Sequence, residues 1–140
     1  MKMSTEQLSE KYLGVVGMSG MSVRQGDTAI AHGSGDVPVL ATPQVIALAE
    51  SATIAALLES MEQGETSVGI RVEFDHVSTA SIGAEVRAIA TCTKVENNRL
   101  TFEIEVHEQE RLIARGLVIR AVVDRVSFLA KAAAQSLSHQ

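Results

Sequence analysis

The sequence predicts an α+β domain in which a curved antiparallel sheet surrounds one buried helix. Three observations support this fold class. Residues 43–61 are largely apolar, contain no Gly and have their only Pro at the start; apolar and polar residues alternate in the segments that follow; and short turns separate those segments. Strands joined by short turns pair antiparallel. A single helix that is apolar on nearly all sides can be covered only if the sheet curls around it.

The helix is the clearest element of the sequence. Thr42 is expected to be its N-cap, and Pro43 suits the first helical position. Apolar residues surround almost the whole cylinder, so the helix should be buried on most sides. They occupy positions 45, 46, 48, 49, 52, 54, 55, 57, 58 and 61. The pair Gln63-Gly64 predicts the end of the segment.

Four strands are expected after the helix, at residues 68–77, 84–95, 100–107 and 112–124. In the first, the alternation places Ile70, Val72, Phe74 and His76 on one face, opposite Arg71, Glu73 and Asp75. In the third, Leu100, Phe102, Ile104 and Val106 should point inward. Two consecutive asparagines at 97–98 predict a two-residue hairpin turn, because both tolerate positive φ.

The remaining segments are less regular. Residues 12–23 predict an irregular strand interrupted by glycines, and residues 27–41 begin like a strand and become a Gly/Pro loop. Residues 1–10 are expected to be flexible, and residues 125–140 should form a short C-terminal helix. One helix and five strands in this order describe the hotdog fold, expected here as a single domain over residues 1–140. The open edges of such a sheet predict a homodimer formed by sheet extension.

Composition excludes several classes of function. The net charge is −5, aromatic residues are 3% of the chain, and no basic stripe is present, so nucleic acid is not an expected partner. The first residues, MKMSTEQLSEKY, are polar and contain no apolar core of a signal peptide, and no apolar run approaches the ~20 residues that span a bilayer, so no membrane role is expected. Cys92 is the only cysteine, which favours a reducing cytoplasm. No metal-binding motif is present, and no metal or redox cofactor is expected.

Four residues are candidates for a catalytic site. Glu50 lies in the middle of the helix near apolar neighbours, where loss of solvation would suit a general base; the alternative is a thin polar stripe on the helix. His76 shares the inward strand face; the alternative is a structural histidine with a satisfied hydrogen bond, or one at the strand end in solvent. Thr42 begins the helix, where free N–H groups stabilise negative charge. Gly69 permits close approach of a ligand, or simply belongs to a turn.

Two further features of the sequence contain possible catalytic groups. Asp27 and His32 have the spacing G-D-x-x-x-x-H and resemble the signature of hotdog hydratases, although Ala29-Ile30 replaces the Asn-Pro of that family. Cys92 shares its strand face with Val86 and neighbouring alanines, which suits an inert core thiol better than a nucleophile.

Three segments carry a resemblance to a known family. GSGDVPVLATPQVIALAE (33–50), SVGIRVEFDHVSTASIGAEVRA (67–88) and NNRLTFEIEV (97–106) resemble the fluoroacetyl-CoA thioesterase-like branch of the hotdog thioesterases, and the similarity covers residues 28–130. The resemblance implies a dimeric hydrolase of short acyl-CoA thioesters, with coenzyme A entering only as part of the substrate. It implies a catalytic group of Thr42, Glu50 and His76, and a thioester carbonyl held by Gly69. Arg120 falls where the family has an arginine, and is implied to support the site or the CoA.

One departure from the family bears on the substrate. The fluoroacetyl-specific member has an aromatic-rich lid before the helix, whereas this chain has GSGDVPVL there, without a phenylalanine. A small generic acyl group is therefore expected in place of a fluorinated one. Two other functions stay open from the sequence alone: an enoyl-CoA hydratase that uses Asp27 and His32, and an acyl-CoA-binding module without catalysis.

Overall fold

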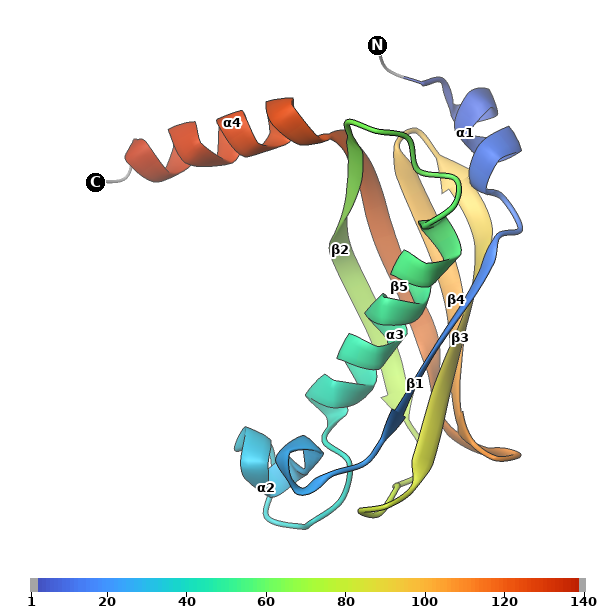
Figure 1. Cartoon of the computed structure of the whole chain (residues 1–140), viewed down its shortest axis with the longest axis vertical. Coiled ribbons are helices and arrows are strands. Elements are labelled where there is room, and N and C mark those ends of the chain that lie inside the picture. The colour runs from blue at the N-terminus through green and yellow to red at the C-terminus, as the bar shows by residue number, and fades with distance from the viewer. Residues whose placement is uncertain (1–2, 139–140) are drawn as a thin grey trace.

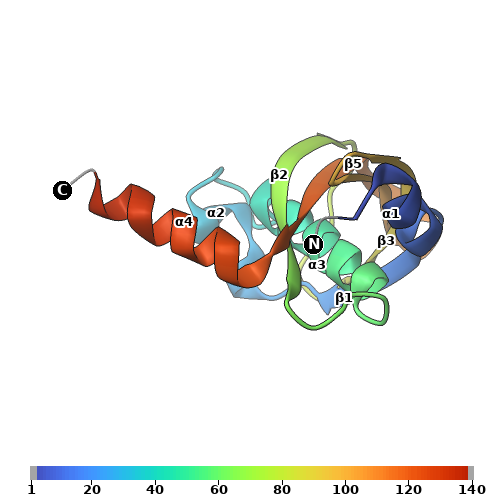
Figure 2. The same ribbon diagram turned by 90° about the horizontal axis from the view of Figure 1, so that it is seen from above.

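The computed structural model describes residues 3–138 and shows one five-stranded antiparallel sheet curled around a central helix (Figure 1). The strands are β1 (Val16–Ser22), β2 (Glu65–His76), β3 (Glu85–Glu96), β4 (Arg99–Glu108) and β5 (Arg111–Asp124). Their order in the sheet is β1-β3-β4-β5-β2, and every neighbouring pair is antiparallel. Helix α3 (Thr42–Leu57) lies in the hollow of the sheet (Figure 2), so the predicted α+β hotdog fold is confirmed.

The core lies between α3 and the concave face of the sheet. The inward residues predicted for the third expected strand, Leu100, Phe102, Ile104 and Val106, are all buried in β4. Cys92 is buried on β3 beside alanines, and burial raises the pKa of its thiol, as expected for a core residue. The two-residue turn at 97–98 is also confirmed, and Asn97 adopts a φ of 55° there.

Strand β1 is shorter than the predicted segment 12–23 and contacts α3 very closely. A Cβ atom added to Gly17 would lie 2.2 Å from the backbone nitrogen of Ala56 and 2.3 Å from the carbonyl oxygen of Ala52. The glycines that made this segment look irregular therefore include one that lets the helix lie directly on the strand.

The predicted limits and burial of the central helix need correction. Ala41, not Thr42, is the N-cap; Thr42 is the first helical residue, and α3 ends at Leu57. One side of the helix is exposed within this single chain: Ile54 is 44% exposed and Leu58, just beyond its end, 73%. The expectation of burial on most sides is therefore wrong for the chain by itself, because the sheet covers only part of the cylinder.

The segment before α3 is helical where a strand-like start was expected. A 3-10 turn, η1 (Gln25–Asp27), is followed by the short helix α2 (Ala29–His32). Side-chain caps explain the difference: the Asp27 carboxylate accepts a hydrogen bond from the Arg24 N–H at 2.8 Å, and the Thr28 hydroxyl accepts one from the Ala31 N–H at 3.2 Å. Such local caps compete with an extended strand.

Both ends of the described chain are helical. The first ten residues were expected to be flexible, but α1 (Thr5–Tyr12) forms there with a capping box between Ser4 and Gln7 and buries Leu8 and Tyr12. Helix α4 (Arg125–Leu137) confirms the expected C-terminal helix and projects away from the rest of the chain (Figures 1 and 2). Within residues 3–138, no helix is long and apolar enough to cross a bilayer.

Candidate active site

Helix α3 and strand β2 form the two walls of the candidate site. Thr42, at the start of α3, contacts His76 at the end of β2, whereas Glu50, farther along the helix, faces Gly69 near the middle of the strand. The helix and the strand therefore run in opposite directions. Thr42 and Glu50 are about two helical turns apart, or about 12 Å along the helix axis.

A β-bulge in β2 decides which residues face the helix. Gly69 pairs with Arg120 and Arg71 pairs with Ile119, so Ile70 has no partner of its own on β5. The extra residue lets Gly69 and the later inward positions Phe74 and His76 share one face, although a regular strand would turn them to opposite faces. The prediction that Ile70 points inward is corrected: its side chain is 45% exposed.

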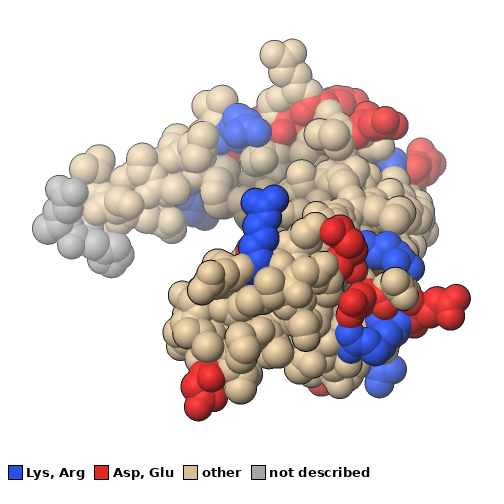
Figure 3. Space-filling view, turned by 60° about the horizontal axis from the view of Figure 1, so that its bottom comes forward, with Lys and Arg blue, Asp and Glu red and all other residues tan. Residues whose placement is uncertain are grey.

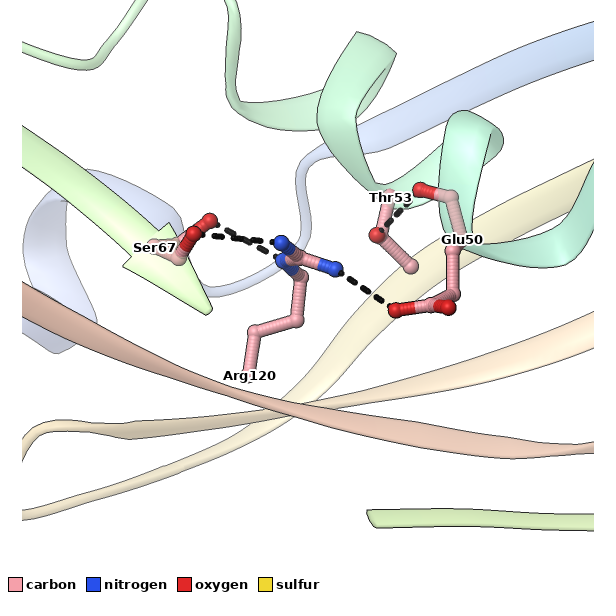
Figure 4. A network of polar contacts seen from close by, with 4 residues as sticks. All are labelled: Glu50, Thr53, Ser67 and Arg120. Carbon is pink, nitrogen blue, oxygen red and sulfur yellow. Dashed lines mark hydrogen bonds and ion pairs between the residues drawn. The ribbon is translucent and has the colours of Figure 1, made fainter. Parts of the chain in front are cut away.

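Arg120 anchors the Glu50 carboxylate (Figure 4). Arg120 Nη1 lies 3.2 Å from Glu50 Oε2, and the other guanidinium nitrogens donate to Ser67, Nε to the hydroxyl at 2.9 Å and Nη2 to the carbonyl oxygen at 3.2 Å. The Arg120 side chain is 8% exposed and that of Glu50 40%. Burial lowers the pKa of Arg120 and the Glu50 charge raises it, so the guanidinium remains a cation at neutral pH.

Gly69 leaves room for that carboxylate. A Cβ atom at this position would lie 2.5 Å from Glu50 Oε2 and 3.4 Å from Arg120 Nη1. The glycine is therefore required by the close approach of an acid, and the ion pair fills the space that a side chain would need. Glu50 is less enclosed than the sequence suggested, and its charged partner is an arginine.

Thr42 and His76 form the second half of the site. The Thr42 hydroxyl and His76 Nδ1 are 2.9 Å apart, and His76 Nε2 is buried without a hydrogen-bond partner among the described residues. Burial lowers the pKa of His76, with a hydrogen bond to the Ser78 backbone acting in the opposite direction. The imidazole is therefore neutral at pH 7, which is the form that accepts a proton.

A cleft opens beside this pair. Its volume is about 280 Å³, and both Thr42 and His76 lie on its wall. The other residues that line it come from the loop before α3 and from the segment after β2: Ala29, Ser34, Val39, Leu40, Val77, Ser78 and Thr79. His76 thus lies on the wall of a space that a small group can enter, although its Nε2 atom is itself buried.

The structure brings the predicted residues together as two pairs. Thr42 meets His76, and Glu50 meets Gly69 and Arg120, but no hydrogen bond or ion pair joins Glu50 to His76 within residues 3–138. Sequence reasoning missed Ser67. The only signal for it was the Ser-x-Gly spacing, which places Ser67 on the strand face of Gly69.

The Asp27–His32 pair does not form a site. The Asp27 carboxylate accepts a hydrogen bond from Gln44 at 2.7 Å in addition to the one from Arg24. His32 is exposed at the end of α2, and no hydrogen bond joins it to Asp27 in the described chain. A water-activating pair is therefore not assembled at these positions. Within the same residues, no group of three or more His, Cys, Asp or Glu side chains is arranged to hold a metal ion.

The fold and the arrangement of α3 against β2 define a hotdog-fold protein, and comparison with known families places it in the thioesterase class. The family model described as fluoroacetyl-CoA-specific thioesterase matches residues 23–126. The chain therefore belongs to the fluoroacetyl-CoA thioesterase family, as the sequence resemblance predicted.

Individual relatives agree with this membership. The fluoroacetyl-CoA thioesterase of Streptantibioticus cattleyicolor is 31% identical over 93 residues, which cover 66% of this chain and 67% of the relative. A solved structure of the fluoroacetyl-CoA thioesterase FlK superposes with a TM-score of 0.78 at 25% identity, covering 86% of this chain and 93% of the other. A hot-dog-like protein from Thermanaerovibrio acidaminovorans, at 22% identity and a TM-score of 0.82, shares the fold over 92% of this chain and 96% of its own.

Proposed function

We propose that this protein hydrolyses short-chain acyl-CoA thioesters to the free acid and coenzyme A. Membership of the thioesterase family supports the reaction class. The observation that carries the proposal is the Glu50 carboxylate, which Arg120 anchors beside Gly69; the neutral imidazole of His76 lies about two helical turns away along the same helix and strand. Hydrolysis needs a nucleophile, a group that moves a proton, and a donor for the developing oxyanion.

Glu50 is assigned as the general base or the direct nucleophile. As base, it removes a proton from water while the water oxygen attacks the thioester carbonyl carbon; the C–S bond then breaks, and the sulfur leaves with the electron pair. As nucleophile, its own oxygen attacks that carbon, the C–S bond breaks in the same way to leave an anhydride, and water then cleaves the anhydride. Arg120 and Ser67 hold the carboxylate in one orientation, which makes them positioning residues.

His76 and Thr42 manage the proton of the leaving group. In either route, His76 is proposed to pass the proton released from water to the thiolate of coenzyme A, and Glu50 returns to its ionised form, so charge and atoms balance over one turnover. The Thr42 hydroxyl fixes the ring through Nδ1, and Nε2, which has no partner among the described residues, is the nitrogen proposed to carry the proton. The Gly69 N–H is proposed to donate to the carbonyl oxygen, where negative charge develops.

The chemistry of the walls supports a small acyl group. The loop over residues 33–40 contains no aromatic residue that would select a fluorinated group by close packing. The cleft beside His76 is lined by small side chains and has a volume of about 280 Å³. No cofactor is required by this mechanism, because coenzyme A enters with the substrate. The single, buried cysteine suits the proposed cytoplasmic location.

A homodimer is proposed as the working form. Strand β2 is an edge of the sheet with an unpaired side, and Ile70 and Val72 on it are 45% and 42% exposed. Antiparallel pairing of β2 with β2 of a second copy would remove the open edge. Such a dimer would also allow the Glu50 and His76 that act on one substrate to come from different chains.

The test is release of free thiol from acetyl-, propionyl- and butyryl-CoA by the purified protein. We expect turnover with all three acyl groups. Binding of these compounds without turnover at any pH between about 5 and 9 would instead establish an acyl-CoA-binding module. Rapid quenching of a single turnover followed by mass spectrometry of the intact chain distinguishes the two roles of Glu50, because only the nucleophilic route attaches the acyl group to the protein.

A further inference from the structure

Helix α4 has no packing surface within its own chain. None of its residues is buried, and its attachment consists of the Arg125 N–H donating to the Gly64 carbonyl oxygen at 2.8 Å and the Asp124 cap on the Ser127 N–H at 2.9 Å. Figures 1 and 2 both show the helix extending past the edge strand β2 and away from the sheet. Isolated helices shorter than about 12–15 residues are marginal in water, so a helix of this length needs a surface to pack on.

One face of α4 is suited to packing. Val126, Leu129, Ala133 and Leu137 lie at i, i+3, i+7 and i+11, which places them on one side of the helix. Of these, Val126 is 74% exposed, Leu129 56% and Leu137 67%. In Figure 3 the projecting helix is almost entirely uncharged surface. Its charged side chains are two cations, Arg125 and Lys131, without an acidic residue.

The topology determines where α4 goes in the proposed dimer. Asp124, the last residue of β5, pairs with Glu65, the first residue of β2. When two β2 strands pair antiparallel about a two-fold axis, the beginning of one strand lies near the end of the other. The helix that leaves at Asp124 therefore extends toward His76 of the partner subunit.

The surface at that end of β2 complements the helix. Val77 lines the Thr42–His76 cleft and is 52% exposed. Ile30 and Val37 are 55% and 49% exposed and belong to the segment before α3, other residues of which line the cleft. Thirteen helical residues span about 20 Å, which is sufficient to cross the mouth of a cleft of this size.

We infer that α4 of one chain packs over the Thr42–His76 cleft of a second copy of this chain and closes it. The inference rests on the proposed dimer and on the proposed function of the site. The cleft of the single chain is open, and the proton transfer assigned to His76 is more effective when bulk water is excluded. Each site is then incomplete without the C-terminal helix of the partner.

A matched pair of substitutions on α4 tests the packing. Ala133→Glu places a carboxylate on the apolar face, and Gln135→Glu places the same carboxylate on the opposite face; both positions are exposed in the single chain. Burial of an unpaired charge is costly, so we expect Ala133→Glu to lower kcat/KM by about tenfold and Gln135→Glu to leave it unchanged. Equal effects of the two substitutions would overturn the inference.

Mixed dimers test whether the helix acts on the other chain. A chain with Ala133→Glu keeps His76, and a chain with His76→Gln keeps an intact α4. If α4 closes the cleft of its partner, mixing the two chains restores activity to about half of the wild-type value per dimer, since one of the two sites is complete. If α4 acts on its own chain, no mixed dimer has a complete site, and the absence of rescue would refute the inference.

A cross-linking measurement gives an answer that does not depend on activity. One chain carries Ala133→Cys and the other Val37→Cys, and a short bis-maleimide is added; Cys92 is buried and serves as the unreactive background. We expect a covalent dimer from this mixture and a much lower yield when Gln135→Cys replaces Ala133→Cys. Equal yields would contradict the packing. A wild-type protein without turnover would refute the proposed function, and the cross-link would still decide the placement of α4.

Discussion

Replacement of Gly69 by alanine tests how closely the geometry of the site is set. The added Cβ atom would lie 2.5 Å from Glu50 Oε2, whereas an ordinary contact begins at 3.4 Å. The carboxylate must therefore retreat by about 1 Å, away from the position in which Arg120 Nη1 holds it at 3.2 Å. Misplacement of a catalytic group by about 1 Å costs about 10²-fold in rate.

We expect Gly69→Ala to lower kcat/KM for acetyl-CoA by about 10²-fold, measured by release of free thiol. The free energy of unfolding should fall by at most about 1–3 kcal/mol, because a flexible side chain can yield to the added methyl group. Gly20→Ala is the matched control: its Cβ atom would meet the Val86 carbonyl oxygen at 3.6 Å, an ordinary contact on β1, so activity should not change.

The same substitution in a Glu50→Asp protein makes this prediction more specific. Glu50→Asp shortens the acid by one methylene group and withdraws it from Gly69, so Gly69→Ala should have little further effect in that background. The two substitutions are then strongly non-additive. A Gly69→Ala protein with the kcat/KM of the wild type would refute the reasoning, because the observed contact between Gly69 and Glu50 would have no bearing on catalysis.

Four further predictions concern Ser67, Cys92 and, in two of them, His76. Ser67→Ala removes the acceptor of Arg120 Nε, and steady-state kinetics should show kcat reduced by about tenfold with KM little changed; an unchanged kcat would show that the arginine needs no second anchor. Because burial lowers the pKa of His76, kcat/KM should decline only as pH falls below about 6.5, and His76→Gln should abolish that decline; a decline beginning above pH 7 would be inconsistent with a buried imidazole. Because the pKa of His76 is lower in the folded than in the unfolded chain, His76 contributes fully to the free energy of unfolding above pH 6.5, and this contribution is lost as pH falls through the lowered pKa. Chemical denaturation should therefore show a smaller decrease in the free energy of unfolding below pH 6.5 for His76→Gln than for the wild type. The raised pKa of the buried Cys92 thiol predicts no alkylation by iodoacetamide at pH 8 in the native protein, and mass spectrometry of the intact chain measures it; rapid labelling would show that β3 opens.

The fold was predictable because its signals are local and repeated. Alternation in β4 identified the buried residues Leu100, Phe102, Ile104 and Val106, and two asparagines identified the hairpin turn. The segment 43–61 was recognised as helical, although its expected burial was too extensive. The helical periodicity shows which positions are apolar, but it does not show whether the sheet of one chain is wide enough to cover them. In the structure the sheet is not wide enough, and Ile54 and Leu58 remain exposed.

Non-local geometry explains what the sequence could not predict. The bulge at Ile70 is not visible in the alternation of β2, yet it turns Gly69 toward Glu50 and exposes Ile70 itself. The Arg120–Ser67 anchor joins residues 53 positions apart in the chain, and only the pairing of β2 with β5 brings them together. Helix α1 was missed because its stability comes from a capping box and from the burial of Leu8 and Tyr12 against the sheet.

The central claim is that the Glu50 carboxylate performs the hydrolysis. The most direct measurement compares kcat/KM for acetyl-CoA of the wild type with that of Glu50→Gln, with the fold of both proteins monitored by circular dichroism. A catalytic base contributes about 10²–10⁴-fold, so we expect a loss of that size in a protein that remains folded. A folded Glu50→Gln protein that hydrolyses acetyl-CoA at the wild-type rate would contradict the assignment.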